Sequence, residues 1–261
     1  MQVLEPAVPV AVRAEFTAAG TAVVVSFDSD TDVGLSEGLL SSRYKGGFQP
    51  TLEHLVLTRI RLPSPCIPYL SFPCSDVFAF TSAEESACRW AGSRQVVLER
   101  SALDVGSALQ VRANRLRAKC PTSVHSAVCA AWGRNTAQTL AVAAPPTPVI
   151  PSLTLRLTPQ LSLSECQPLS LSMGGSSGNG GRDWASVRLS VNGDSTSPRL
   201  LYQSAELRNT SATVFPRGQF SLDEYHSFQL EVCSFLGGCA TRSVGIFALA
   251  SEIKPVVAIN R

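Results

Sequence analysis

Residues 228–248 read FQLEVCSFLGGCATRSVGIFA, with apolar side chains at every second position on both sides of a glycine pair. The alternating apolar residues are Phe228, Leu230 and Val232 before the glycines, and Val244, Ile246 and Ala248 after them. Because successive side chains of a β-strand point to opposite faces, each run predicts a strand with one buried face. The glycines favour a turn, so the stretch predicts a β-hairpin.

Two cysteines flank that turn, and their position in the alternation predicts how they pair. Cys233 and Cys239 fall on the strand face opposite the apolar residues, so they can meet across the hairpin. A disulfide that closes residues 234–238 fits this arrangement. An immunoglobulin-like core bridge from Cys166 to Cys233 fits less well, because it needs Cys233 to face inward.

The other cysteines extend the disulfide pattern. The chain has 8 cysteines and no CxxC pair, which favours disulfides in an oxidising compartment over metal or redox sites. Proximity in the sequence favours the pairs Cys74–Cys88 and Cys120–Cys129. Cys66 and Cys166 are left over, and the connectivity stays open because even six cysteines allow about 15 pairings.

The same alternation precedes the hairpin. The apolar sets are Leu153/Leu155/Leu157, Leu169/Leu171/Met173 and Val187/Leu189/Val191. With the hairpin they predict a β-sandwich over residues 152–252. Residues 145–151 contain four prolines, which lack the amide donor that a sheet needs, and predict a linker between two domains. Residues 253–261 resemble the first strand of a further module.

Residues 1–144 predict a second sandwich-like unit. Its predicted strands are residues 10–17, 21–27, 95–98 and 108–116, with Val23, Val25 and Phe27 on one face and Leu109, Val111 and Ala113 on another. Residues 37–73 lack alternation and predict an irregular insertion, for which one hypothesis is a translated intron. The expected fold class is therefore all-β, with two consecutive immunoglobulin- or fibronectin III-like β-sandwich units.

Composition argues against several functional classes. Charged residues make up 16% of the 261 residues and the net charge is +2, so no basic surface for nucleic acid is expected. The N-terminal residues lack the basic and apolar regions of a signal peptide, and no stretch of about 20 apolar residues could span a bilayer. Since the cysteines indicate secretion, we expect the signal and any membrane anchor to lie outside this chain.

Several segments resemble the REJ (receptor for egg jelly) family. Residues 14–32, AEFTAAGTAVVVSFDSDTD, resemble the opening of modules in large algal REJ-containing surface proteins. CQPLSL at 166–171, SSGNGGRDW at 176–184, YHSF at 225–228 and CSFLGGC at 233–239 are similar in order and spacing to REJ regions of polycystin-like receptors. With residues 88–90 and 109–117, the resemblance covers most of the chain outside residues 37–73.

This resemblance implies a non-catalytic ectodomain segment, a PKD/REJ-like glycoprotein module of a polycystin-like membrane protein at the cell surface. Such modules would act in cell adhesion, ligand binding or mechanosensing. The expected partners are cell-surface proteins or glycans, with membrane attachment through another part of the protein. The alternatives are a secreted matrix protein with the same modules and, less favoured, a carbohydrate-active or proteolytic enzyme.

Possible metal sites are each outweighed by a simpler interpretation. Cys120, His125 and Cys129 could supply three zinc ligands, but no fourth ligand follows at a recognisable spacing, which favours a disulfide loop. Asp28, Asp30 and Asp32 begin like a calcium loop. That loop requires glycine where Val33 stands and a closing glutamate where Leu39 stands. We therefore expect no metal site.

Catalytic and cofactor motifs are equally incomplete. The glycine-rich run 174–181 is not followed by the Lys and Ser/Thr of a phosphate-binding loop, so a flexible connection is expected. Trp90 and Trp184 are expected in the core, and residues 223–226 are expected in a solvated turn that enters a strand. None of His54, His125 and His226 lies in a catalytic motif, so no catalytic residue or cofactor is expected. The sequon Asn209-Thr210-Ser211 predicts glycosylation at Asn209 in an exposed loop.

Overall fold

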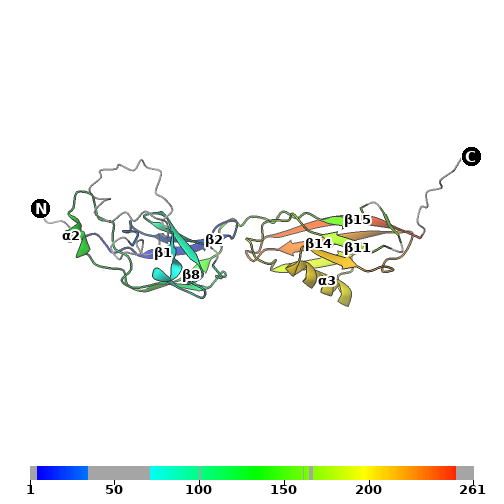
Figure 1. Ribbon diagram of the computed structural model, residues 1–261, viewed down its shortest axis with the longest axis horizontal. Coiled ribbons are helices and arrows are strands. Elements are labelled where there is room, and N and C mark those ends of the chain that lie inside the picture. The colour runs from blue at the N-terminus through cyan, green and yellow to red at the C-terminus, as the bar shows by residue number, and fades with distance from the viewer. Residues whose placement is uncertain (1–4, 35–70, 100, 161, 165–166, 251–261) are drawn as a thin grey trace, which may run out of the picture. The chain divides into compact units, whose positions relative to one another are not determined.

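The computed structural model describes residues 5–34, 71–99, 101–160, 162–164 and 167–250 (Figure 1). Strands predominate, which confirms the expected all-β class. The chain divides into two compact units, Met1–Pro146 and Thr147–Arg261, and the division falls within the proline-rich segment 145–151. Cys66, Cys166, His54, Leu39 and residues 253–261 lie outside the described residues.

The first unit is built on strands that form one continuous hydrogen-bonded order, β3-β5-β6-β2-β1-β8-β7-β4. The strands are β1 (Ala11–Phe16), β2 (Ala22–Phe27), β3 (Ser71–Pro73), β4 (Phe78–Ala79), β5 (Ala87–Gly92), β6 (Gln95–Glu99), β7 (Ala108–Val111) and β8 (Gln138–Ala143). A 3-10 helix, η2 (Cys74–Asp76), and a short helix, α2 (Ser126–Ala130), lie between them. Strand β1 joins the strands β3-β5-β6-β2 to the strands β8-β7-β4, because it pairs antiparallel with β2 and parallel with β8.

The core of this unit follows the predicted alternation, with two corrections. Val23 and Val25 have no exposed surface and Phe27 is 5% exposed. The strand predicted over 108–116 ends at Val111, because the side chain of Asn135 accepts the backbone N–H groups of residues 115 and 116 in place of a strand partner. Residues 71–73, expected in the irregular insertion, form strand β3 against β5; residues 35–70 lie outside the described residues.

The second unit is a sandwich of two sheets, ordered β10-β15-β14-β12 and β13-β11-β9. The strands are β9 (Arg156–Thr158), β10 (Ser162–Ser164), β11 (Leu169–Ser172), β12 (Ser186–Val191), β13 (Ala212–Phe215), β14 (Glu224–Cys233) and β15 (Cys239–Leu249). The predicted hairpin is β14–β15, with Cys233 opposite Cys239. Its inward residues Phe228, Leu230 and Val232 have no exposed surface, and they pack in one core with Leu169, Leu171 and Phe215 of the other sheet.

One helix in this unit was not predicted. Helix α3 (Pro198–Asn209) starts at Ser197, whose side chain accepts the N–H of Leu200, and it buries Leu200 and Leu207 (Figure 1). It contacts the edge strand of each sheet: Ser204 Oγ accepts the N–H of Leu189 in β12 at 3.0 Å, and Gln203 Nε2 donates to the carbonyl of Val214 in β13 at 3.4 Å. The helix therefore closes the open side of the sandwich and satisfies edge groups that would otherwise be free to pair with another chain.

Candidate functional site

In each unit a strand near the N-terminal end pairs in parallel with the last strand that the structure describes. Ala14 and Glu15 of β1 lie opposite Val142 and Ala143 of β8. In the second unit, Ser162–Ser164 of β10 lie opposite Phe247–Leu249 of β15. When the ends of such a unit are pulled apart, the two parallel strands are drawn in opposite directions along their length. The hydrogen bonds between the two strands run roughly perpendicular to the pulling direction, so the force acts on all of them at once.

The C-terminal end of the linker is held by the glycine-rich loop of the second unit, residues 174–181. Ser152 and Ser177 exchange two backbone hydrogen bonds of 2.9 Å, and Thr154 N–H donates to Ser176 Oγ at 3.0 Å. A β-carbon on Gly178 would lie 2.8 Å from Cα of Pro151, so only glycine permits this approach. Within residues 174–181, expected as a flexible connection, Gly178 packs against buried Pro151 and forms one side of its seat; the flexibility of the run stays a prediction.

The turn of the β14–β15 hairpin forms the other side of that seat. A β-carbon on Gly238 would lie 3.1 Å from the carbonyl oxygen of Val149 and 3.2 Å from Cδ of Pro151. The Arg182 guanidinium lies 4.3 Å from the centre of the Phe235 ring, which connects the glycine-rich loop to the hairpin turn. We call residues 149–152, with the loop 174–182 and the turn 234–238, the linker clasp.

Three disulfides are present in the described residues, between Cys74 and Cys88, Cys120 and Cys129, and Cys233 and Cys239. These are the three pairs that the sequence predicts. The first bridge is fully buried, and Cys129 of the second is 8% exposed. In the third, Cys233 is half-buried and Cys239 is exposed.

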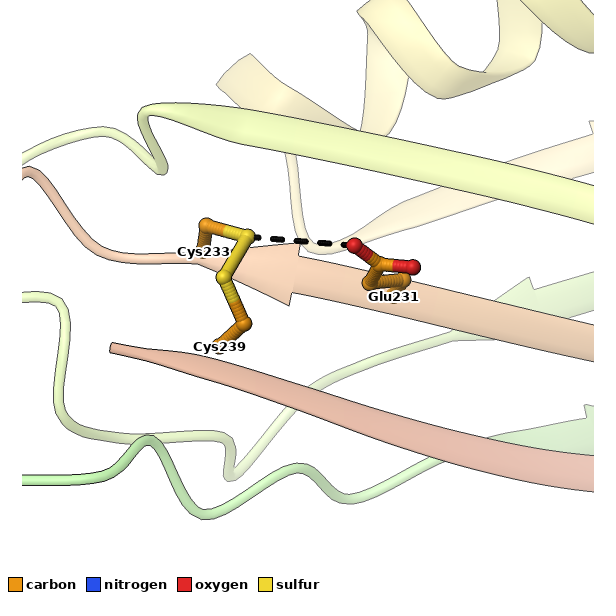
Figure 2. Close-up of side chains that lie close together, drawn as sticks. All are labelled: Glu231, Cys233 and Cys239. Carbon is orange, nitrogen blue, oxygen red and sulfur yellow. Dashed lines mark hydrogen bonds between the residues drawn. A yellow bond between two sulfur atoms is a disulfide. The ribbon is translucent and has the colours of Figure 1, made fainter. Parts of the chain in front are cut away.

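The third bridge has a carboxylate beside it (Figure 2). Glu231 Oε1 lies 4.0 Å from Cys233 Sγ, and ligand atoms of Glu231, Cys233 and Cys239 lie within 4.8 Å of one another. A disulfide sulfur carries no proton and is no thiolate, so this approach is a close contact without a donated hydrogen. While the bridge is intact, the trio lacks the thiolates that a soft metal needs.

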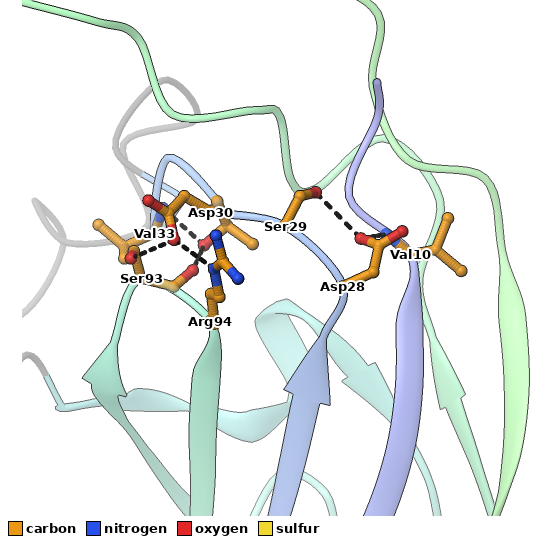
Figure 3. Close-up of polar contacts among 8 residues, drawn as sticks. Val10, Asp28, Ser29, Asp30, Val33, Ser93 and Arg94 are labelled. Atoms are coloured by element: carbon orange, nitrogen blue, oxygen red, sulfur yellow. Dashed lines mark hydrogen bonds and ion pairs between the residues drawn. The ribbon is translucent and has the colours of Figure 1, made fainter. Parts of the chain in front are cut away.

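The aspartates after β2 hold a loop together (Figure 3). Asp30 Oδ1 accepts hydrogen bonds from Arg94 Nε at 2.6 Å and Ser93 Oγ at 2.9 Å, which lowers the pKa of that carboxyl. The backbone N–H of Val10 donates to Asp28 Oδ1 at 2.9 Å and lowers the pKa of Asp28. Asp32 Oδ1 accepts from the backbone N–H groups of residues 34 and 117. These carboxylates are occupied by protein donors, as expected for a polar strand end.

The residues considered for zinc or catalysis have structural roles. The sulfurs of Cys120 and Cys129 are bonded to each other, and His125 caps helix α2 by accepting the N–H of Ala127 at 3.3 Å. Residues 223–226 lead from an exposed turn into strand β14 as expected, and His226 is the one of the four that is buried, at 4% exposed. Its Nε2 lies 2.9 Å from the carbonyl of Ser221, which can only accept, so Nε2 donates and Nδ1 accepts from Asn192 Nδ2 at 3.1 Å.

The tryptophans and the glycosylation sequon complete the predicted positions. Trp90 is 4% exposed and lies between the rings of Phe27 and Phe72, with centroids 6.1 and 6.0 Å away. Trp184 is 6% exposed, so both belong to the core as predicted. Asn209 is the last residue of α3 and not part of a loop; its glycosylation stays a prediction.

The described residues offer little enclosed space. A hollow lined by Leu163, Ser164, Gln167, Phe220 and neighbouring residues has a volume of about 10 Å³, which is room for about one water molecule. Among the described residues, no helix has both the length and the apolar character needed to cross a membrane.

Comparison with known proteins finds a distant likeness to solved structures. No protein-family model matches the chain, and no curated protein matches it. A crystal structure of the FN1–FN3 domains of chicken CNTN1 resembles the chain at 10% sequence identity and a TM-score of 0.27, with 92% of this chain and 67% of that chain covered. So slight a likeness says nothing about function, and the fold assignment rests on the strands and sheets described above.

Proposed function

We propose that this chain is a non-catalytic, tension-bearing segment of a cell-surface protein, of the REJ type found in polycystin-like membrane proteins. The observation that supports it is the parallel pairing of β1 with β8 and of β10 with β15. Three disulfides are compatible with an extracellular location, because such bonds persist in oxidising compartments.

The geometry of the strands favours resistance to pulling along the chain. Force on the ends of a unit shears a parallel pair, so its hydrogen bonds must break together. Force across a hairpin opens one bond at a time. Forced unfolding is governed by the unfolding rate, so a pair sheared as a group keeps that rate low under load. Two such units in series would hold the parts of a receptor at a set spacing and transmit tension in adhesion or mechanosensing.

Single-molecule pulling tests the proposal. The chain is first stretched from its two ends. In a second geometry the second unit is held at residue 149 and at residue 238 in the hairpin turn, which pack against each other in the linker clasp. The second geometry does not shear β10 against β15, so we expect its rupture force to be clearly lower. Equal forces in both geometries would refute a tension-bearing role for the parallel pairs.

A secreted matrix protein with the same two units remains the second candidate. It would show the same mechanical behaviour, so the distinction lies in the full-length gene product. Sedimentation of that product with washed membranes supports the membrane receptor, whereas its recovery in the soluble matrix fraction supports the alternative. Release of reducing sugar or cleaved peptide by the folded chain would instead favour an enzyme.

The partners we propose are cell-surface proteins or glycans, with membrane attachment outside this chain. The low charge of the chain, 16% charged residues and a net charge of +2, supports this choice over nucleic acid. Pull-down of surface proteins and glycans, with a nucleic-acid filter assay beside it, tests the assignment. Binding to DNA or RNA that survives physiological salt would contradict it.

A further inference from the structure

We propose that the Cys233–Cys239 disulfide is a redox modification site whose state sets how tightly the linker clasp holds residues 149–152. The reactant is a dithiol reductant. Its thiolate attacks one sulfur, the bond between Cys233 and Cys239 breaks, and a mixed disulfide forms. The second thiol of the reductant then displaces the remaining cysteine. Two protein thiols and one oxidised reductant result, so two electrons and two protons pass to the protein.

Exposure singles out this bridge among the three disulfides. Cys239 is exposed, whereas Cys74 and Cys88 have no exposed surface; in the second bridge Cys120 is half-buried and Cys129 is 8% exposed. Exchange requires the attacking thiolate to reach a sulfur atom. Cys239 is therefore the most exposed target for a reductant among the six bonded cysteines, since each of the others is half-buried or buried.

The bridge is coupled to the linker through the hairpin turn. It closes residues 234–238, which otherwise hold their shape by two backbone hydrogen bonds, from Ser234 to Gly238 at 2.8 Å and from Gly237 to Ser234 at 3.0 Å. Gly238 is the residue against which Val149 and Pro151 pack. Without the covalent closure, the turn gains conformational freedom and one wall of the seat for Pro151 is loosened.

Glu231 influences the chemistry of the same bridge. When a thiolate attacks exposed Cys239, the leaving group is the Cys233 thiolate, and the Glu231 carboxylate lies 4.0 Å from that sulfur (Figure 2). A neighbouring like charge disfavours the thiolate and slows the exchange. Glu231 thus slows the reduction of a disulfide that is otherwise accessible.

Amide hydrogen exchange tests the coupling without any pulling experiment. The oxidised chain is compared with the chain treated with mild dithiothreitol and with a Cys233→Ser/Cys239→Ser double variant. We expect severalfold faster exchange at the amides of Ser152 and Ser177, which bond each other, and unchanged exchange at Leu230 in the core strand. A Cys120→Ser/Cys129→Ser double variant is the matched control and should leave Ser152 and Ser177 unchanged.

Three outcomes would overturn the proposal. Unchanged exchange at Ser152 and Ser177 would show that the clasp does not depend on the bridge. Equal acceleration at Leu230 would show that the bridge stabilises the whole unit. Reduction of either Cys74–Cys88 or Cys120–Cys129 before Cys233–Cys239, measured by differential alkylation, would remove the selectivity.

The rate of reduction by dithiothreitol separately tests the effect of Glu231 on the exchange reaction. Glu231→Gln should increase the rate severalfold, and the charge-matched control Glu224→Gln, also exposed on β14, should not. Equal rates in the two variants would remove Glu231 from the proposal. None of these measurements applies force, so their failure would leave the tension-bearing function standing.

Discussion

Single polar side chains take over the hydrogen bonding where strands of this chain stop. Asn135 is 3% exposed and bonds four backbone groups, accepting from residues 115 and 116 and donating to residues 112 and 136. Apolar alternation identified the strand that ends near Val111, but it could not reveal this end, because the partner that stops the strand lies about twenty residues further along.

Replacing Asn135 tests how much its hydrogen bonds stabilise the first unit. Asn135→Ala leaves buried backbone groups without partners and should lower the free energy of unfolding of the first unit by about 2–4 kcal/mol. Urea unfolding measures the loss. The control Thr136→Ala removes an exposed side chain next to it and should change stability by less than about 0.5 kcal/mol. A loss as small in Asn135→Ala as in the control would contradict the assigned role.

Asp30 makes the stability of the first unit depend on pH, and the direction of that dependence follows from its lowered pKa. Its pKa is lowered in the folded chain, chiefly by the hydrogen bond from Arg94, so the folded state favours the ionised form. The resulting stability is present above the unfolded pKa and is lost as the pH falls through the folded pKa. Asp30→Asn should therefore flatten the acid side of the stability profile as the pH falls below 3.8, the ordinary pKa of this carboxyl. The control Asp183→Asn, in the second unit, should leave that profile of the first unit unchanged.

At the scale of elements, the prediction succeeded where local pattern decides and failed where another part of the fold decides. The hairpin β14–β15 and its disulfide follow from alternation alone. Helix α3 was not predicted, although Ser197-Pro198 is a recognisable start, because the many glycines and prolines of the chain favour short strands. The contact of Gly178 with Pro151 could not be predicted from the glycine-rich run, because Pro151 lies in a different segment of the chain.

Ser204 tests the closure of the sandwich by α3. Ser204→Ala leaves the N–H of Leu189 buried without an acceptor and should cost about 1–3 kcal/mol in the second unit. Leu201→Ala, whose side chain is 58% exposed on the same helix, should cost less than about 0.5 kcal/mol. Similar losses from both variants, measured by urea unfolding, would show that the helix acts only through its apolar contacts.

The glycine-rich loop offers a pair of variants that separates packing from backbone strain. Gly178 and Gly181 both have positive φ, 98° and 76°, but only a β-carbon on Gly178 meets Pro151, whereas one on Gly181 meets nothing within 4 Å. Gly181→Ala should thus cost about 1 kcal/mol through strain alone. Gly178→Ala should cost clearly more and should also speed amide exchange at Ser152. Equal losses would show that Pro151 can move away freely.

For the whole molecule, the two separate cores predict independent unfolding. Each unit buries its own apolar cluster, so we expect two transitions in urea or on heating. Asn135→Ala should shift only one of them and Ser204→Ala only the other, because the two residues belong to different units and share no hydrogen-bond partner among the described residues. A single transition moved by both variants would show that the units unfold as one.

The seat of Pro151 also affects where the chain can be divided. A fragment that began at residue 152 would keep every strand of the second sandwich, yet it would lack the proline ring that covers Gly178 and Gly238. Its first residues would lose their anchorage, and the uncovered patch would be open to other chains. A cut before residue 147 keeps Pro151 packed against Gly178 and Gly238. The second unit therefore begins at Thr147, inside the proline-rich segment, and not after it at residue 152.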